Sequence, residues 1–232
     1  EAMHSREHVE YNEMLDRAGL PASQLDNFLW RFLALIQKAL GKRLTLAGTI
    51  ALEHYTALMA DQLLRNPEVL GENSDPAYKQ MWMWHAYEET EHKAVAYDVW
   101  NHVLPDNLHN RFSRRLAMVL ATAIFWPLVA YFHMRLVFAD KTIKGGHLKG
   151  FWTVTKMLWG KKVGVLRNPV ANGEFLDYFK TDFHPWMHDN SKFLTEIDNF
   201  VASVEGAGRK PNTEIANAIR ARLNSQLKAS AA

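Results

Sequence analysis

Apolar residues recur every three or four positions along most of the chain, which is the spacing that places them on one side of an α-helix. This pattern predicts a helix over residues 1–18, a second over 23–40 and a third over 42–65. Turn-forming residues separate these segments, and Gly41 divides the last two. No segment alternates between apolar and polar residues for long enough to predict a β-sheet, so the pattern predicts an all-α protein.

Two helix starts carry additional signals. Ser23 is followed three residues later by Asp26, which predicts a capping box at the start of the second helix. Asp75-Pro76 places a capping side chain before a proline at the first helical position, and it predicts a fourth helix that continues to about residue 103. After Gly145-Gly146 the pattern is less regular, and a polar helix is expected from Asn212 onward.

The segment from Leu116 to Phe132 carries no charged residue and is just short of the roughly 20 residues that cross a membrane. Arginines flank it, and aromatic and basic residues follow at 151–162. The interpretation that we favour is a buried helix that covers the rest of the protein. The alternative is a hydrophobic surface that touches a membrane and admits a lipid-like substrate.

Composition narrows the chemistry. The chain contains no cysteine, which excludes disulfides, thiolate metal sites and iron–sulfur clusters. Its formal net charge of +2 is too small to indicate a nucleic-acid-binding protein. Any bound metal must therefore be held by oxygen and nitrogen ligands, and the 11 histidines direct attention to two clusters.

The first cluster contains Glu1, His4 and His8. A helix turns by about 100° per residue, so these positions fall within about 60° of one another and can face one point. A single Glu-x-x-His pair is common on helix surfaces and would be weak evidence for a metal site.

The second cluster consists of four residues on one side of the fourth helix, namely His85, Glu88, Glu89 and His92. Glu91 points away from them and is expected to be solvated. Glu89 and His92 repeat the Glu-x-x-His spacing of the first cluster, and each cluster has a further histidine in line. This repetition indicates a metal site, although the spacing leaves open whether Glu88 or Glu89 is the ligand.

The third helix supplies one more candidate, Glu53, among apolar neighbours where a carboxylate would be costly to bury unless it bound a cation. His54 points about 100° away from Glu53, and we interpret it as a surface residue or a neighbour of the ligands. Two Glu-x-x-His helices and single glutamates on two others form the ligand set of di-iron and di-manganese helical bundles. The pattern therefore predicts two metal ions, with iron preferred over manganese or zinc.

The sequence also resembles a known family. Glu-Ala-Met-His-Ser-Arg-Glu-His at residues 1–8 is similar to the first motif of the bacterial "predicted metal-dependent hydrolase" family. The stretch from Trp84 to Lys93, with Asp98, is similar to its second motif, and Phe183-His184-Pro185-Trp186 is similar to its C-terminal motif. The resemblance implies a ferritin-like helical domain with a metal. The family pattern continues ahead of Glu1 with a further acidic helix, and we expect this numbering to begin inside a longer protein.

These observations combine into one expected architecture, a ferritin-like four-helix bundle with additional C-terminal helices. Residues 1–105 would form the metal-binding bundle, and residues 106–232 would add the hydrophobic helix and a C-terminal helical region of the same domain. Tyr55, Asp98 and His184 are expected next to the ligands. His184 is held in an extended conformation by the proline after it, and the alternative for its loop is a surface turn anchored by Trp186.

Carboxylate-rich sites between helices suit metals that react with dioxygen, so we expect an oxidoreductase that acts on a hydrophobic small molecule. The first alternative is a metal-dependent hydrolase, because such a site could also lower the pKa of a bound water. The second is a non-catalytic metal-binding protein. We expect a cytoplasmic homodimer that forms through the hydrophobic segment, makes peripheral membrane contact and binds no nucleic acid.

Overall fold

The computed structural model describes residues 2–161 and 164–205, and for residues 2–4, 198 and 201–205 it describes the backbone only. Its α-helices are α1 (Ala2–Arg17), α2 (Ala22–Arg65), α3 (Pro76–His92), α4 (Val95–Val103), α5 (Leu108–Ala139), α6 (His147–Trp159), α7 (Arg167–Ala171), α8 (Glu174–Asp177) and α9 (Leu194–Glu205). Short 3₁₀ helices lie at Pro67–Leu70, Pro185–Met187 and Ser191–Phe193. The described residues contain no strand, which confirms the all-α prediction.

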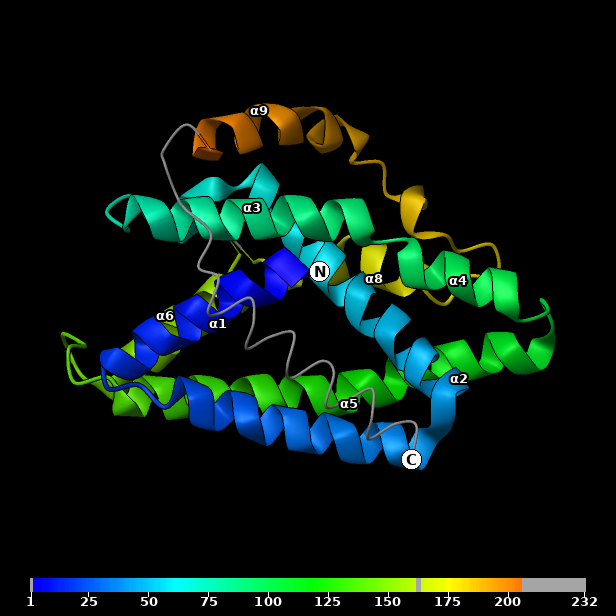
Figure 1. Cartoon of the computed structure of the whole chain (residues 1–232), viewed down its shortest axis with the longest axis horizontal. Coiled ribbons are helices and arrows are strands. Elements are labelled where there is room, and N and C mark those ends of the chain that lie inside the picture. Colours follow the sequence, from blue (N-terminus) through cyan, green and yellow to red (C-terminus); the bar gives the residue numbers. More distant parts are fainter. Residues whose placement is uncertain (1, 162–163, 206–232) are drawn as a thin grey trace.

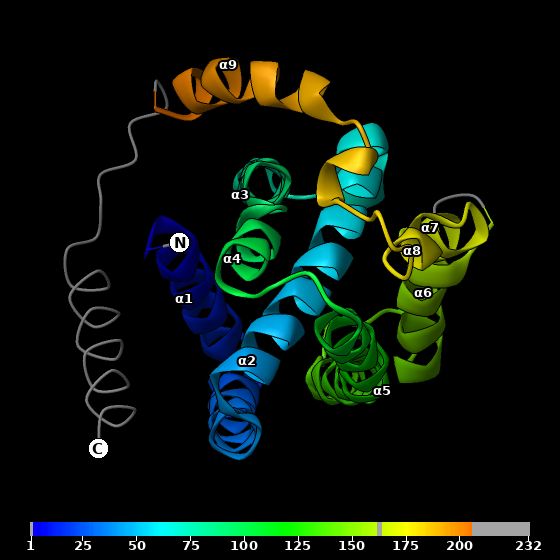
Figure 2. The ribbon, with the colours of Figure 1, turned by 90° about the vertical axis from the view of Figure 1, so that its right-hand side faces the viewer.

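Helix α2 is the central element, and it packs against α1, α3, α4, α5 and α8. Its first part runs beside α5 along one side of the molecule (Figure 1), whereas its second part rises away from α5 with α1, α3 and α4 on the same side of it (Figure 2). Viewed from the side, α1 and α6 lie on opposite flanks of this central helix (Figure 2). The four-helix bundle of the ferritin-like type stays a prediction.

The change of direction in α2 occurs at Gly41, whose φ of 71° and ψ of 170° are not helical. A side chain disfavours this backbone conformation, so the glycine is needed there. The predicted break at Gly41 is therefore confirmed, and it takes the form of a kink between the two parts of α2. The predicted ends at Arg65 and at the Asp75-Pro76 start are also confirmed, and Asp75 accepts hydrogen bonds from the backbone of Ala77 and Tyr78.

Two local predictions are wrong. Ser23 does not cap α2, because its backbone N–H and hydroxyl both donate to the carboxylate of Asp16 at the end of α1. The helix predicted from residue 76 to about 103 is divided into α3 and α4 at Lys93 and Ala94. The side chain of Lys93 is drawn to a distant loop, where its Nζ donates to the carbonyl of His188.

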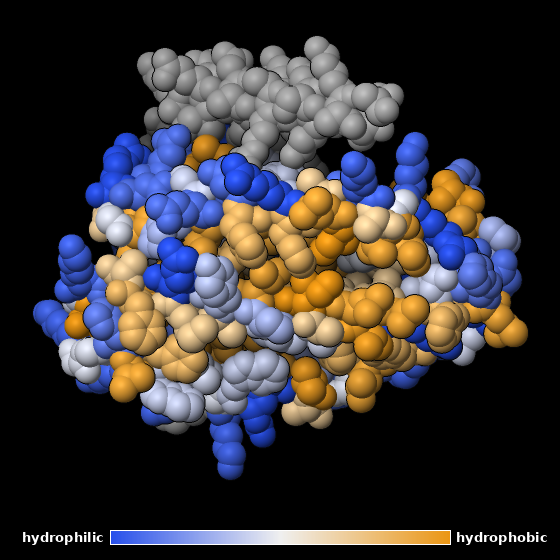
Figure 3. All heavy atoms as spheres, turned by 90° about the horizontal axis from the view of Figure 1, so that it is seen from below, coloured by the Kyte–Doolittle hydropathy of each residue, from blue (hydrophilic) through white to orange (hydrophobic). Residues whose placement is uncertain are grey.

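The prediction that Leu116 to Phe132 is buried is also wrong. These residues belong to α5, and by length and composition this is the one described helix that could cross a membrane. Only 11% of its most apolar 18-residue window is buried. Seen from the α5 side, apolar residues cover a broad area of the surface (Figure 3).

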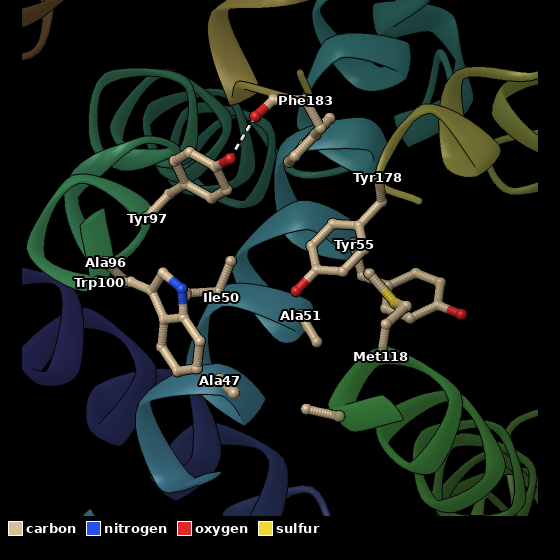
Figure 4. Packing of buried hydrophobic residues seen from close by; sticks show 11 residues of the cluster. Ala47, Ile50, Ala51, Tyr55, Ala96, Tyr97, Trp100, Met118, Tyr178 and Phe183 are labelled. Atoms are coloured by element: carbon tan, nitrogen blue, oxygen red, sulfur yellow. Dashed lines mark hydrogen bonds between the residues drawn. The ribbon is translucent and has the colours of Figure 1, made fainter. Parts of the chain in front are cut away.

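The main apolar core lies on the other side of α5, where α2, α4, α5 and the segment around residues 178–183 meet (Figure 4). Its largest fully buried members include Met118, Tyr178 and Phe183. The hydroxyl of Tyr97 donates to the carbonyl of Phe183, which fastens the C-terminal segment to α4. The core therefore fixes α2 and α4, two of the elements that carry predicted site residues.

Candidate metal centre and an adjoining polar pocket

The contact between α1 and α3 brings together two of the predicted histidines. His8 Nε2 lies 3.1 Å from His85 Nδ1, so one ring donates a hydrogen bond to the other. The ring of Trp82 packs against both imidazoles, with centroid distances of 5.9 Å to His8 and 5.4 Å to His85. His8 and His85, which are 77 positions apart in the chain, are thus in contact at a partly buried position.

The glutamates of α3 accompany its histidines one helical turn apart. His85 Nε2 lies 3.6 Å from Glu89 Oε1, and His92 Nε2 lies 3.9 Å from Glu88 Oε2. All four side chains are less than one third exposed. The predicted common side of this helix is therefore organised as two histidine–glutamate pairs, and Glu91 is exposed as expected.

Burial dominates the electrostatics of the α1 side chains. It lowers the pKa of His8 below the usual value, and the negative charge of Glu7 offsets part of this effect. A histidine with a lowered pKa is neutral at pH 7 and keeps a nitrogen lone pair that can bind a metal ion. Burial also raises the pKa of the nearby Tyr11, which therefore stays protonated.

The remaining predicted ligands stand as follows. Glu53 on α2 is half-buried and its Oε2 atom is shielded from solvent, and α2 packs against both α1 and α3. Glu1 and the side chain of His4 lie outside the described residues. Within the part of the chain that the structure describes, no group of three or more histidine, aspartate or glutamate residues is arranged to hold a metal ion. The full ligand set therefore stays a prediction.

The three residues expected beside the ligands have well-defined partners. The hydroxyl of Tyr55 lies 2.7 Å from Thr122 Oγ1, and its ring stacks on Phe125, so this tyrosine faces α5. Asp98 Oδ1 lies 3.0 Å from His184 Nε2, which joins α4 to the C-terminal motif. Their predicted role next to a metal stays untested.

The loop that carries His184 packs where α3 ends. The ring of Trp186 lies 4.0 Å from the Nζ atom of Lys93, which is a cation–π contact. Lys93 Nζ also donates to the carbonyl of His188 at 2.8 Å and to Asn190 Oδ1 at 2.7 Å. The loop is thus fastened one residue after the predicted ligand His92, with Trp186 as an anchor.

The interpretation of His54 as a surface residue is wrong. Its exposed fraction is 5%, and its ring packs among Tyr178, Phe183 and His188. Burial, followed by the positive charge of His188, lowers its pKa to about 3, so its ring is neutral. Helical spacing could have revealed this burial, because His54 continues the apolar series of Ala47, Ile50, Ala51 and Leu58.

His54 lines a polar pocket of about 270 Å³ between α2, α8 and the 185–190 loop, together with Asp61, Arg65, Lys93, Glu174, His188 and Asn190. His188 Nε2 lies 2.9 Å from Asp177 Oδ2. Burial lowers the pKa of Lys93 to about 8 and raises the pKa of Glu174. The sequence offered no signal for Glu174 or Asp177, because α8 is only four residues long and has no periodic pattern.

Comparison with known proteins adds one finding. A family model described as "Predicted metal-dependent hydrolase" matches residues 1–189, a range that contains both histidine–glutamate clusters and the C-terminal motif. No curated protein and no solved structure matches the chain.

Proposed function

The chain belongs to the predicted metal-dependent hydrolase family, and we propose that it is a metal-dependent hydrolase. This is the first of the two alternatives raised by the sequence. The family description gives no support to the preferred expectation, an oxygen-activating oxidoreductase. The activity assay distinguishes this reaction from hydrolysis. The family also implies a metal cofactor, whereas iron as its identity and two as its number remain proposals.

The observation that carries the proposal is the meeting of nitrogen and oxygen donors at the α1–α3 contact. His8 and His85 come from different helices, and Glu89 lies within 3.6 Å of His85. These donor types suit iron, manganese and zinc, and neutral imidazole is the form that binds them. The residues that would hold the metal are Glu1, His4, His8, Glu53, His85, Glu88, Glu89 and His92.

A bound metal of this class polarises a carbonyl or phosphoryl oxygen and lowers the pKa of water. Glu89, His85 and His8 form a series in which each group lies within 3.6 Å of the next, so donors from two helices that would hold the metal lie close together in the fold. The ring of Trp82 contacts both imidazoles edge-on and takes up part of the space beside them.

The test begins with the metal content of the full chain produced with ample iron, manganese and zinc. Elemental analysis is expected to find at least one metal per chain in the native protein. His85→Ala and Glu89→Gln should lower metal affinity by about tenfold or more, because each removes a donor or its partner. Glu91→Gln is the matched control, since Glu91 is a glutamate of the same helix that points into solvent.

Activity separates the reaction classes. Each metal-loaded form is assayed for release of nitrophenol from short- and long-chain nitrophenyl esters, and for oxygen uptake after anaerobic iron loading. Ester turnover that needs metal and disappears in His85→Ala supports the hydrolase. Oxygen uptake with a transient absorption band and no ester turnover would replace it with the oxidoreductase. A metal content below one ion per chain would contradict both the hydrolase and the oxidoreductase.

A further inference from the structure

The surface formed by residues 22–43 and 108–161 is apolar to an unusual degree. We call it the α2–α5–α6 surface. Large apolar side chains on it are between about two fifths and two thirds exposed, among them Leu35, Phe112, Val119, Leu120, Met134 and Phe138. On α5 the exposed positions recur every three or four residues, so they form one stripe along the length of the helix (Figure 3). An apolar stripe of this extent is normally covered by a partner or by lipid.

The opposite side of α5 is held by the protein along its whole length. Near its start, Arg114 Nη1 donates to the carbonyl of Tyr178 at 2.7 Å. In its middle the ring of Phe125 stacks on Tyr55, and towards its end the ring of His133 stacks on Phe151 of α6. A helix fastened in this way cannot leave the protein to cross a bilayer, so its free stripe can meet lipid only from the side.

Charge is segregated to the same surface. Residues 22–43 and 108–161 contain 13 Lys and Arg, of which Arg114 is buried, but only 2 Asp and Glu, whereas the whole chain has 27 and 25. The exposed basic residues include Lys38 on α2, and Lys149 and Lys156 on α6. Trp30, Trp152 and Trp159 are also exposed there. An exposed apolar stripe, tryptophans and many cations are the features of an element that lies in an anionic membrane interface.

We infer that the α2–α5–α6 surface docks on an anionic lipid bilayer, with α5 parallel to the membrane plane. A second copy of the chain fits the same surface less well, because two surfaces of the same strong positive charge would repel one another. The inference does not rest on the proposed hydrolysis, since it involves none of the predicted metal ligands.

Vesicle flotation tests the inference. The full chain is mixed with vesicles of phosphatidylcholine alone or of phosphatidylcholine with phosphatidylglycerol, and the floated fraction is measured at low and high salt. We expect binding to the anionic vesicles that weakens by about tenfold or more as salt screens the basic residues. Binding to the neutral vesicles is expected to be weak.

Two variants assign the binding to this surface. Val119→Gln with Leu120→Gln removes apolar contact from α5, and Lys149→Glu with Lys156→Glu reverses charge on α6. Each is expected to lower vesicle binding by about tenfold or more. Val95→Gln with Val99→Gln is the matched control, because these valines are equally exposed but lie on α4. All altered side chains are exposed, and circular dichroism verifies that each variant is folded.

Three results would overturn the inference. The first is an absence of flotation with anionic vesicles. The second is a concentration-dependent dimer, seen by analytical ultracentrifugation, that the α5 variant abolishes, since this would assign the surface to a second copy. The third is protein that stays with membranes through high salt and alkaline washing and needs detergent for release, since this would make α5 an integral anchor.

Discussion

Replacement of Arg114 by methionine tests how the C-terminal segment is held against α5. Arg114 is 3% exposed, and its guanidinium donates to the carbonyl of Tyr178 at 2.7 Å and to that of Lys180 at 3.3 Å and lies over the ring of Tyr178 at 4.5 Å. The rings of Phe183 and Tyr97 lie at 5.3 and 5.5 Å. Methionine has a similar length and can fill the space but cannot donate.

The expected loss in unfolding free energy is the sum of three contributions. Two carbonyls lose a charged donor, which costs about 1–3 kcal/mol for each buried acceptor left without a partner, and the 3.3 Å bond lies at the low end. Loss of the cation–π contacts adds about 1 kcal/mol. Removal of a buried charge returns part of the desolvation cost, so the net loss in unfolding free energy should be about 3 kcal/mol.

Urea unfolding followed by circular dichroism measures this loss. A destabilisation of about 3 kcal/mol should also lower the melting temperature by about 6–12 °C in a chain of this size. Arg111→Met is the control, because Arg111 is an arginine of the same helix that pairs with Asp106 at the surface, and its loss should leave stability unchanged. A change below about 1 kcal/mol for Arg114→Met would refute the view that this arginine fastens the segment.

Three further predictions concern single residues. Burial raises the pKa of Tyr178 to about 12. The neutral hydroxyl therefore contributes fully to the free energy of unfolding below pH 10, and about 2 kcal/mol of that free energy is lost between pH 10 and 12. Urea titrations should show that Tyr178→Phe escapes this loss, and equal losses in both proteins would contradict the prediction. Asp75→Ala should cost about 1 kcal/mol in the same assay, because Asp75 caps α3 through two backbone N–H groups. Gly41→Ala should cost about 1–3 kcal/mol through backbone strain alone, since no atom lies within 4 Å of the added methyl group; an unchanged midpoint would show that the kink relaxes.

Helix boundaries were predictable wherever the backbone itself requires a residue type. Gly41 adopts a positive φ, and Asp75-Pro76 supplies a cap and a proline at the first turn, so both boundaries can be read without knowledge of the tertiary structure. The boundary at Lys93 differs, because neither Lys93 nor Ala94 disfavours a helix. It is accompanied by a side chain that reaches the carbonyl of His188, a contact that joins residues 95 positions apart.

The candidate site shows the same limit. Helical spacing predicted that His85, Glu88, Glu89 and His92 share one side of a helix, and in the structure His85 lies near Glu89 and His92 near Glu88, because these pairs are one turn apart. It also proposed that His8 and His85 would share a site, and the 3.1 Å contact between them agrees with that proposal. The polar pocket was not predicted, since Glu174 and His188 approach His54 only through the fold of the irregular C-terminal segment.

The apolar segment at 116–132 shows why composition alone could not decide its environment. A buried helix and an interfacial helix both need an uncharged stripe, and they differ only in what lies against it. In the fold, contacts such as that of Thr122 with Tyr55 occupy one side of α5, and the other side is left exposed. The charge pattern was equally hidden, because the basic residues of 22–43 and 108–161 are balanced by acidic residues elsewhere and give a net charge of only +2. Only when α2 folds beside α5, with Phe28 against Phe132, do these cations come to lie on one surface. A near-neutral chain can therefore present a strongly basic apolar side to a membrane.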